Sequence, residues 1–178
     1  MKIQQPGPHI DHMLRQTRIH HVQLSSMADV KANMLVTMAS VVITLSIPRL
    51  SESPFKVATL VLILFCFITI ILAVYASMPK LPFNLKAESL DEARSKNFNL
   101  LFFGDFSRLT YEDFEGQMEE VLNNHNRVYE VQIKEIYILG KFLVTKKYRF
   151  LRLAYLSFVV GLFASGIFFF FANRYLQQ

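Results

Sequence analysis

The stretch VATLVLILFCFITIILAVYASM, residues 57–78, decides the fold because it runs for 22 residues without a charged side chain. As an α-helix, a window of about 20 apolar residues spans the roughly 30 Å hydrocarbon core of a bilayer. A second window covers residues 153–172, between Arg152 and Arg174. Both windows predict transmembrane helices, so lipid is the solvent for a large part of this chain.

A third apolar run, residues 32–47, is shorter and contains several polar side chains. We interpret it as a span as well, because its helix can extend past Lys31, whose ammonium group reaches toward the lipid headgroups. Pro48 and Pro54 bracket a short turn before the next span. The sequence therefore predicts an all-α membrane protein, assembled as a homo-oligomeric helical bundle, with three spans at residues 32–47, 57–78 and 153–172.

The N-terminal arm divides into two parts. Residues 1–8 contain proline and glycine and are expected to form a flexible tail. Residues 9–31 contain neither, and their apolar residues recur near helical spacing. This pattern predicts a cytoplasmic helix that runs into the first span without a break.

Residues 79–152 are expected to form a cytoplasmic helical sensor region. A short helix is predicted near residues 85–97, and residues 98–103 are compatible with a strand or a buried loop. Thr110 resembles the first residue of a capping box, which predicts a helix to about Leu122. After an Asn-rich interruption, a further helix continues into the third span.

Positive charge sets the predicted orientation. Lysine and arginine gather in the N-terminal arm and in residues 79–152, whereas residues 48–56 contain only Arg49 and Lys56. The positive-inside rule then places the N-terminus and residues 79–152 on the cytoplasmic side. The same rule explains most of the formal net charge of +5, with anionic-ligand binding as a minor contributor.

Polar residues in the first span follow one helical face. Asn33, Thr37, Ser40 and Thr44 are spaced four, three and four residues apart, which stacks them on one side of a helix. Polar groups are costly in contact with lipid. Two interpretations remain open: this face packs on another helix through hydrogen bonds, or it lines a water-filled path in an oligomer.

The same register continues toward the N-terminus through Asp29, Ser26, Arg18, Arg15 and Asp11. Asp29 and Lys31 flank the membrane boundary. They are either simple boundary charges or gating residues that pair with a neighbouring subunit. In the third span, small residues at 157, 161 and 165 predict a surface that a second helix can approach closely.

No catalytic constellation is evident. The chain has no glycine-rich phosphate loop, no HExxH motif and no cysteine ligand pair, since Cys66 is its single cysteine. His9 and His12 have metal-ligand spacing without an obvious third ligand, and exposed histidines explain them as well. We therefore expect a protein that is not an enzyme and needs neither a metal nor a cofactor.

Short motifs then occur in a characteristic order along the chain. They are Ala28-Asp-Val-Lys-Ala32, Asn99-Leu-Leu-Phe-Phe-Gly-Asp-Phe106, Leu109-Thr-Tyr-Glu-Asp-Phe114, Ile136-Tyr-Ile-Leu-Gly140 and Lys147-Tyr-Arg-Phe-Leu-Arg-Leu-Ala-Tyr155. This ordered set resembles the transmembrane effector family named after the Pycsar anti-phage systems, over about residues 10–172.

The resemblance implies an effector of abortive anti-phage defence in the bacterial inner membrane. A partner nucleotidyltransferase or cyclase makes a nucleotide signal, and the effector responds by opening a pore in the membrane or disrupting it. The ligand is either a cyclic nucleotide or a short single-stranded oligonucleotide, and it either activates or inhibits. The subunits form a homo-oligomer, with a tetramer as the best guess.

Basic residues outside the spans are the candidates for binding an anionic ligand, although each is also explained as ordinary cytoplasmic charge. Arg15 and Arg18 share the face of the polar stripe, so phosphate binding there would bias helix packing directly. The remaining candidates are Arg94, Lys96, Arg108, Lys146, Lys147 and Arg149.

Two rival functions are kept at this stage. The first is a non-conducting membrane anchor or adaptor that recruits a soluble partner. The second is a membrane enzyme, which the lack of a catalytic constellation disfavours.

Overall fold

The computed structural model describes residues 3–79 and 98–176, and every regular element in that part of the chain is a helix. The long helices are α1 (Pro8–Ser46), α2 (Lys56–Ser77), α6 (His125–Phe142) and α7 (Arg149–Leu176). The described residues contain three helical stretches long and apolar enough to cross a membrane. The predicted all-α class and the three membrane-length helices are therefore confirmed.

The chain divides into two compact units. Unit 1 comprises Met1–Leu24 and Pro79–Leu143, and unit 2 comprises Ser25–Met78 and Val144–Gln178. Helix α1 is continuous across residues 24 and 25, as the lack of proline and glycine in residues 9–31 predicts. The apolar spans fall in unit 2, and most of the polar sequence falls in unit 1.

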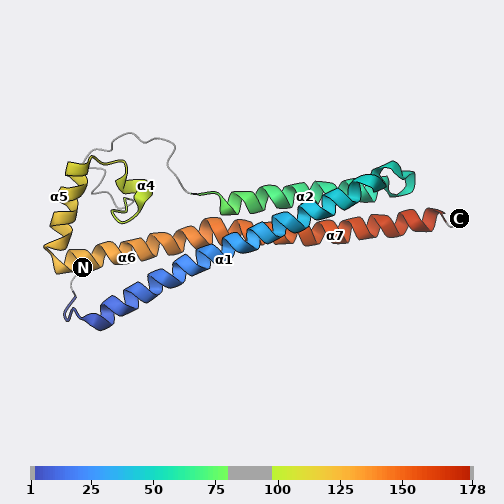
Figure 1. The fold of residues 1–178 in the computed structure, drawn as a ribbon. Coiled ribbons are helices and arrows are strands. Elements are labelled where there is room, and N and C mark those ends of the chain that lie inside the picture. Colours follow the sequence, from blue (N-terminus) through green and yellow to red (C-terminus); the bar gives the residue numbers. More distant parts are fainter. Residues whose placement is uncertain (1–2, 80–97, 177–178) are drawn as a thin grey trace. The chain divides into compact units, whose positions relative to one another are not determined.

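Unit 2 is a three-helix bundle in which α2 and α7 pack side by side along their lengths (Figure 1). The part of α1 in this unit contributes its buried face to the same core. The short 3₁₀ helices η1 (Ile47–Ser51) and η2 (Ser53–Phe55) form the turn between α1 and α2. Phe55 of η2 stacks on Phe169 of α7, with ring centroids 4.7 Å apart, which ties this turn to α7.

Small residues set the spacing of the bundle. The buried core contains Ala32, Ala39, Ala73 and Ala154, each no more than 1% exposed. A Cβ atom added to Gly161 of α7 would lie 2.4 Å from the Cβ of Phe65 in α2. The small-residue surface predicted around residue 161 therefore does receive a second helix, which is α2 of the same chain.

Unit 1 has a different core. The helices α5 (Tyr111–Leu122) and α6 pack on each other and on the segment that contains Phe98 and Leu100. That segment is a buried loop, so the strand alternative for residues 98–103 is wrong; α4 (Phe103–Phe106) follows it. The helix predicted near residues 85–97 lies outside the described residues.

The helix caps of unit 1 match the local sequence. The backbone N–H of Asp113 donates to Thr110 Oγ1 at 3.2 Å, as the capping-box pattern predicts. Asn124 caps α6 by accepting from the N–H groups of Asn126 and Arg127. The predicted interruption between the two helices is thus the joint between α5 and α6. From α6, a π-helical segment η3 (Leu143–Tyr148) leads into α7.

Candidate functional site

The polar stripe of α1 does not face the core of unit 2. Asn33, Thr37, Ser40 and Thr44 are all exposed in the single chain. The face of α1 that packs in the core is formed instead by Ala28, Ala32, Leu35 and Ala39. Within the described residues of one chain, the stripe is therefore not covered by α2 or α7, and hydrogen-bonded packing on those helices does not account for it.

Two hydroxyls of the stripe are satisfied by their own helix. Thr37 Oγ1 donates to the carbonyl of Asn33 at 3.0 Å, and Thr44 Oγ1 donates to the carbonyl of Ser40 at the same distance. Such local bonds lower the cost of placing threonine in a membrane helix. They do not apply to Asn33, which is exposed at the start of the span and needs water or a partner chain for its carboxamide.

A partly buried ion pair lies near the start of the apolar run of α1. Lys147 Nζ donates to both carboxylate oxygens of Asp29, at 2.7 and 2.6 Å, and to the carbonyl of Ser25 at 3.4 Å. The Lys147 side chain is 9% exposed and that of Asp29 is 39% exposed. Asp29, predicted as a boundary or gating charge, is thus paired within its own chain.

This ion pair joins α1 to the π-helical segment η3. The neighbouring Lys146 donates to the carbonyl of Met78 at 3.2 Å, and its Nζ lies 5.2 Å from the centroid of the Tyr75 ring. Two successive lysines of η3 therefore fasten it to α1 and to the end of α2. Because π-helical turns occur frequently at functional sites, we treat η3 and its two lysines as part of the candidate gating machinery.

The basic candidates from the sequence fall into four groups. Arg15 and Arg149 are exposed, as is Lys31 of the gating candidates. Arg18, Lys146 and Lys147 have protein partners, with Arg18 Nε lying 3.2 Å from Glu135 Oε1. Arg108 is half-buried in the turn after α4. Arg94 and Lys96 lie outside the described residues.

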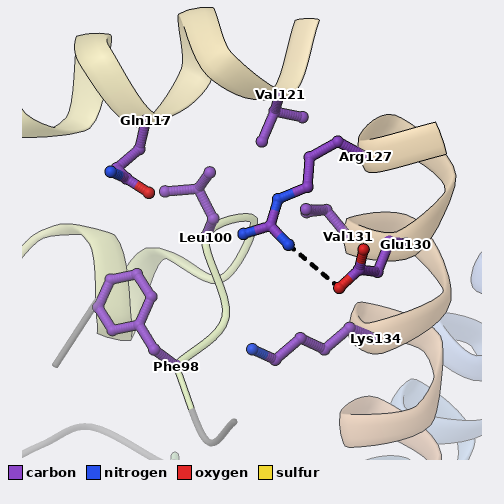
Figure 2. Close-up of a pocket in the computed structure, with 8 residues that line it drawn as sticks. All are labelled: Phe98, Leu100, Gln117, Val121, Arg127, Glu130, Val131 and Lys134. Carbon is purple, nitrogen blue, oxygen red and sulfur yellow. Dashed lines mark hydrogen bonds and ion pairs between the residues drawn. The ribbon is translucent and has the colours of Figure 1, made fainter. Parts of the chain in front are cut away.

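A pocket in unit 1 brings together basic residues that the sequence analysis did not single out (Figure 2). Arg127 and Lys134 project into it from α6, and Gln117 projects from α5. The two basic residues are seven positions apart, about two helical turns, so their shared face was readable from the sequence. The residues of the opposing wall could not be predicted from the sequence. The lining residues are Phe98, Leu100, Gln117, Val121, Arg127, Glu130, Val131 and Lys134.

The charged groups of this pocket are partly withdrawn from water. Burial lowers the pKa of Lys134, and the positive charge of Arg127 lowers it further, against the opposing effects of Glu130 and Asp105. Arg127 Nη1 lies 3.1 Å from Glu130 Oε1. Arg127 Nε is buried and has no hydrogen-bond acceptor among the described residues.

The fold and these features define an α-helical membrane protein with three membrane-length helices and a second helical unit. The family described as Pycsar effector protein domain matches residues 12–172, so the chain belongs to the Pycsar effector family. It is thus a membrane effector of anti-phage defence, and effectors of this family respond to cyclic-nucleotide signals from a partner cyclase. No match to the chain was found among the curated proteins or the solved structures.

Proposed function

We propose that several copies of this chain assemble in the bacterial inner membrane and that their α1 helices surround a path for ions, which a nucleotide ligand opens or closes. The observation that carries this proposal is the polar stripe formed by Asn33, Thr37, Ser40 and Thr44, which stays exposed on a membrane-spanning helix. A tetramer is the assembly we propose.

Oligomer formation resolves the energetic problem of the stripe. Exposed Met34, Met38 and Leu45 lie beside it on α1 and suit lipid or a neighbouring helix, whereas Asn33 and Ser40 do not suit lipid. If copies of α1 face a common axis, the stripe lines water and the core face of each α1 stays packed on its own α2 and α7. The bundle of each subunit would remain intact.

In the proposed orientation, the N-terminus and residues 79–152 are cytoplasmic. This orientation follows the excess of lysine and arginine in those segments. Unit 1 then meets the signal made by the partner nucleotidyltransferase or cyclase, and unit 2 meets the lipid bilayer. The ligand would be a cyclic nucleotide or a short single-stranded oligonucleotide, acting as an activator or an inhibitor.

Gating would act through α1, because this helix belongs to both units. Arg15 and Arg18 lie in its unit 1 part, and Asp29 and Lys31 lie at the start of its span. A ligand that prefers one packing of α1 would shift the population of that packing. The Asp29–Lys147 ion pair is a discrete contact that such a shift would keep or break.

Ion flux through liposomes that contain the purified full chain tests the proposal. We expect Thr37→Leu combined with Ser40→Leu to abolish flux and cell toxicity, because it replaces the polar lining with apolar side chains. The matched control is Met34→Leu combined with Met38→Leu on the neighbouring exposed row, which should leave flux unchanged because methionine and leucine are similar in volume.

Unchanged flux in the Thr37→Leu, Ser40→Leu variant would remove the stripe as the path. If the wild-type chain shows no flux with or without ligand, this result supports the rival function, a non-conducting membrane anchor that recruits a soluble partner. Crosslinking of the chain in membranes measures the subunit number independently of flux.

A further inference from the structure

The pocket between α5, α6 and the loop at residues 98–101 has features of an anion site. In Figure 2 the guanidinium of Arg127 and the ammonium of Lys134 lie on one side of Leu100, and the carboxamide of Gln117 lies on its other side; all three residues line the pocket. These groups come from two helices that pack on each other within unit 1. Each can donate hydrogen bonds, and an arginine and a lysine at one site favour an acceptor with negative charge.

The size of the pocket limits what can enter. Its enclosed space is about 40 Å³, which is room for about three water molecules when each needs 10–15 Å³. A single phosphate group is of that order, whereas a whole nucleotide is much larger. An entering ligand would therefore place one phosphate among the donors and leave its sugar and base in the open part of the hollow.

The guanidinium of Arg127 is only partly paired by protein groups. Glu130 pairs with Nη1 of Arg127, while the buried Nε of the same guanidinium has no acceptor among the described residues. The lowered pKa of Lys134 shows that burial and the nearby guanidinium outweigh the acidic groups around this lysine. An anion placed between Arg127 and Lys134 would give the buried Nε an acceptor and would stabilise the charged form of Lys134.

Apolar walls strengthen this preference. Phe98, Leu100, Val121 and Val131 are buried and belong to the core of unit 1. They exclude water from one side of the charged groups, and hydrogen bonds to charged groups are stronger where the local dielectric constant is low. The pocket thus combines an apolar wall with the charged groups of Arg127 and Lys134.

We infer that Arg127, Lys134 and Gln117 bind the phosphodiester group of the nucleotide signal, which makes this pocket the ligand site of unit 1. The inference rests on the proposed function for the existence of such a signal. The same phosphodiester chemistry is present in a cyclic mononucleotide and in a short single strand, and the binding experiment below distinguishes these two sources.

Glu130 gives the inference a gain-of-affinity test. In the ligand-free chain its carboxylate occupies one edge of the Arg127 guanidinium, so an incoming phosphate must compete with it and is also repelled by it. Glu130→Gln removes this negative charge and keeps the side-chain shape. Its affinity for the phosphodiester should rise, a result that a misfolded variant would not give.

The experiment is a calorimetric titration of the purified full chain in detergent micelles. The probes are the four 3′,5′-cyclic ribonucleotides and a mixed-sequence single-stranded tetranucleotide. Arg127→Gln and Lys134→Gln should each weaken binding of the recognised probe about ten-fold or more, the lower end of the range for a hydrogen bond to a charged group. Lys141→Gln is the matched control, because it removes the same charge from α6 outside the pocket, and its affinity should stay within about two-fold of the wild type.

The outcomes separate this site from the proposed function. Unchanged affinity in both Arg127→Gln and Lys134→Gln overturns the pocket as the ligand site. A nucleotide-gated ion path would still stand, with the ligand bound elsewhere, for example at Arg15 and Arg18. If no probe binds the wild-type chain, both the pocket and the nucleotide part of the proposed function are wrong, and the ion path is still judged by the flux experiment. Weaker binding in Glu130→Gln would also contradict the inference.

Discussion

The two units of this chain are held together by different kinds of residue. The core of unit 2 contains alanines from all three of its helices beside Leu35, Leu151 and Phe158, and α2 approaches α7 closely at Gly161. The core of unit 1 contains Phe98, Leu100, Val121 and Val131. The difference fits the proposed placement of unit 2 in lipid and of unit 1 in the cytoplasm. In water, large apolar side chains stabilise a fold by leaving the solvent, whereas in lipid they gain little from burial and close backbone approach matters more.

Each unit also contains an ion pair that joins α1 to a later part of the chain, and the two pairs differ in the same way. In unit 2, Lys147 is buried and donates to both oxygens of Asp29. In unit 1, Glu135 is buried against Arg18, whose side chain is 55% exposed. The first pair satisfies a buried cation, whereas the second leaves a buried carboxylate with one partly solvated partner.

The largest effect is expected from breaking the pair in unit 2. Lys147→Met should lower the stability of unit 2 by about 1.5–3 kcal/mol, the typical contribution of a hydrogen bond to a charged group, because Asp29 is left without its partner. Cys66 is the single cysteine of the chain and is 1% exposed in the core of unit 2. The rate at which a thiol reagent labels it on heating therefore reports the opening of this unit.

The double variant Asp29→Asn, Lys147→Met is the control for this prediction. If the pair acts as a unit, the double variant loses less stability than the sum of the two single variants. Losses that add without coupling would show that the contact contributes nothing specific. Lys147→Met with wild-type labelling of Cys66 would contradict the role of the pair altogether.

The packing difference between the units is tested at the glycines of α7. Gly161→Ala places a methyl group where the Cβ of Phe65 lies only 2.4 Å away, so α2 and α7 must shift. We expect a loss of about 1–3 kcal/mol, the usual cost of overpacking a core, again measured by labelling of Cys66.

Gly166→Ala is the matched control on the same helix, because a Cβ there meets nothing within 4 Å. This variant should be as stable as the wild type or slightly more stable, since alanine favours the helix by about 1 kcal/mol over glycine. Equal destabilisation by both substitutions would mean that the contact with Phe65 does not explain the result at Gly161, since helix propensity favours alanine at both positions.

Much of the fold could be predicted from local sequence. The charge-free windows predicted the three membrane-length helices, the lack of proline and glycine in residues 9–31 predicted a helix that runs into the first span, and Thr110 predicted the start of α5. Each of these signals depends on residues within a few turns of one another. The buried loop at Phe98 was ambiguous because a short apolar run fits a strand equally well.

The site was less predictable because its contacts are distant in sequence. The stripe on α1 follows from helical periodicity, but which face of α1 packs in the core depends on where α2 and α7 lie. Lys147 and Asp29 are 118 positions apart, and nothing in either local sequence indicates that they pair. In the pocket, Arg127 and Lys134 share a helical face, yet only the packing of α5 places Gln117 opposite them.

The smallest effect is expected at the Arg18–Glu135 pair of unit 1. Here the substitution should raise the stability of the unit, whereas the substitution at Lys147 lowers it. Burial raises the pKa of Glu135 above 4.5, and Arg18 opposes this rise only in part. The folded chain therefore holds the Glu135 proton more tightly than the unfolded chain, so the stability from neutral Glu135 is fully present below pH 4.5. That stability is lost as the pH rises through the raised folded pKa.

Glu135→Gln should consequently make unit 1 slightly more stable than the wild type at pH 7, because glutamine places no charge in this buried position. Hydrogen exchange of the α6 amides, corrected for the intrinsic rate at each pH, measures the difference. The difference should shrink as the pH falls toward 4.5, where the wild-type carboxyl is protonated as well.

The exposed Glu120 of α5 supplies the control, since Glu120→Gln should leave the exchange of α6 unchanged at both pH values. If Glu135→Gln loses protection at pH 7, the ion pair with Arg18 outweighs the cost of burying the carboxylate, and the contrast between the two pairs fails.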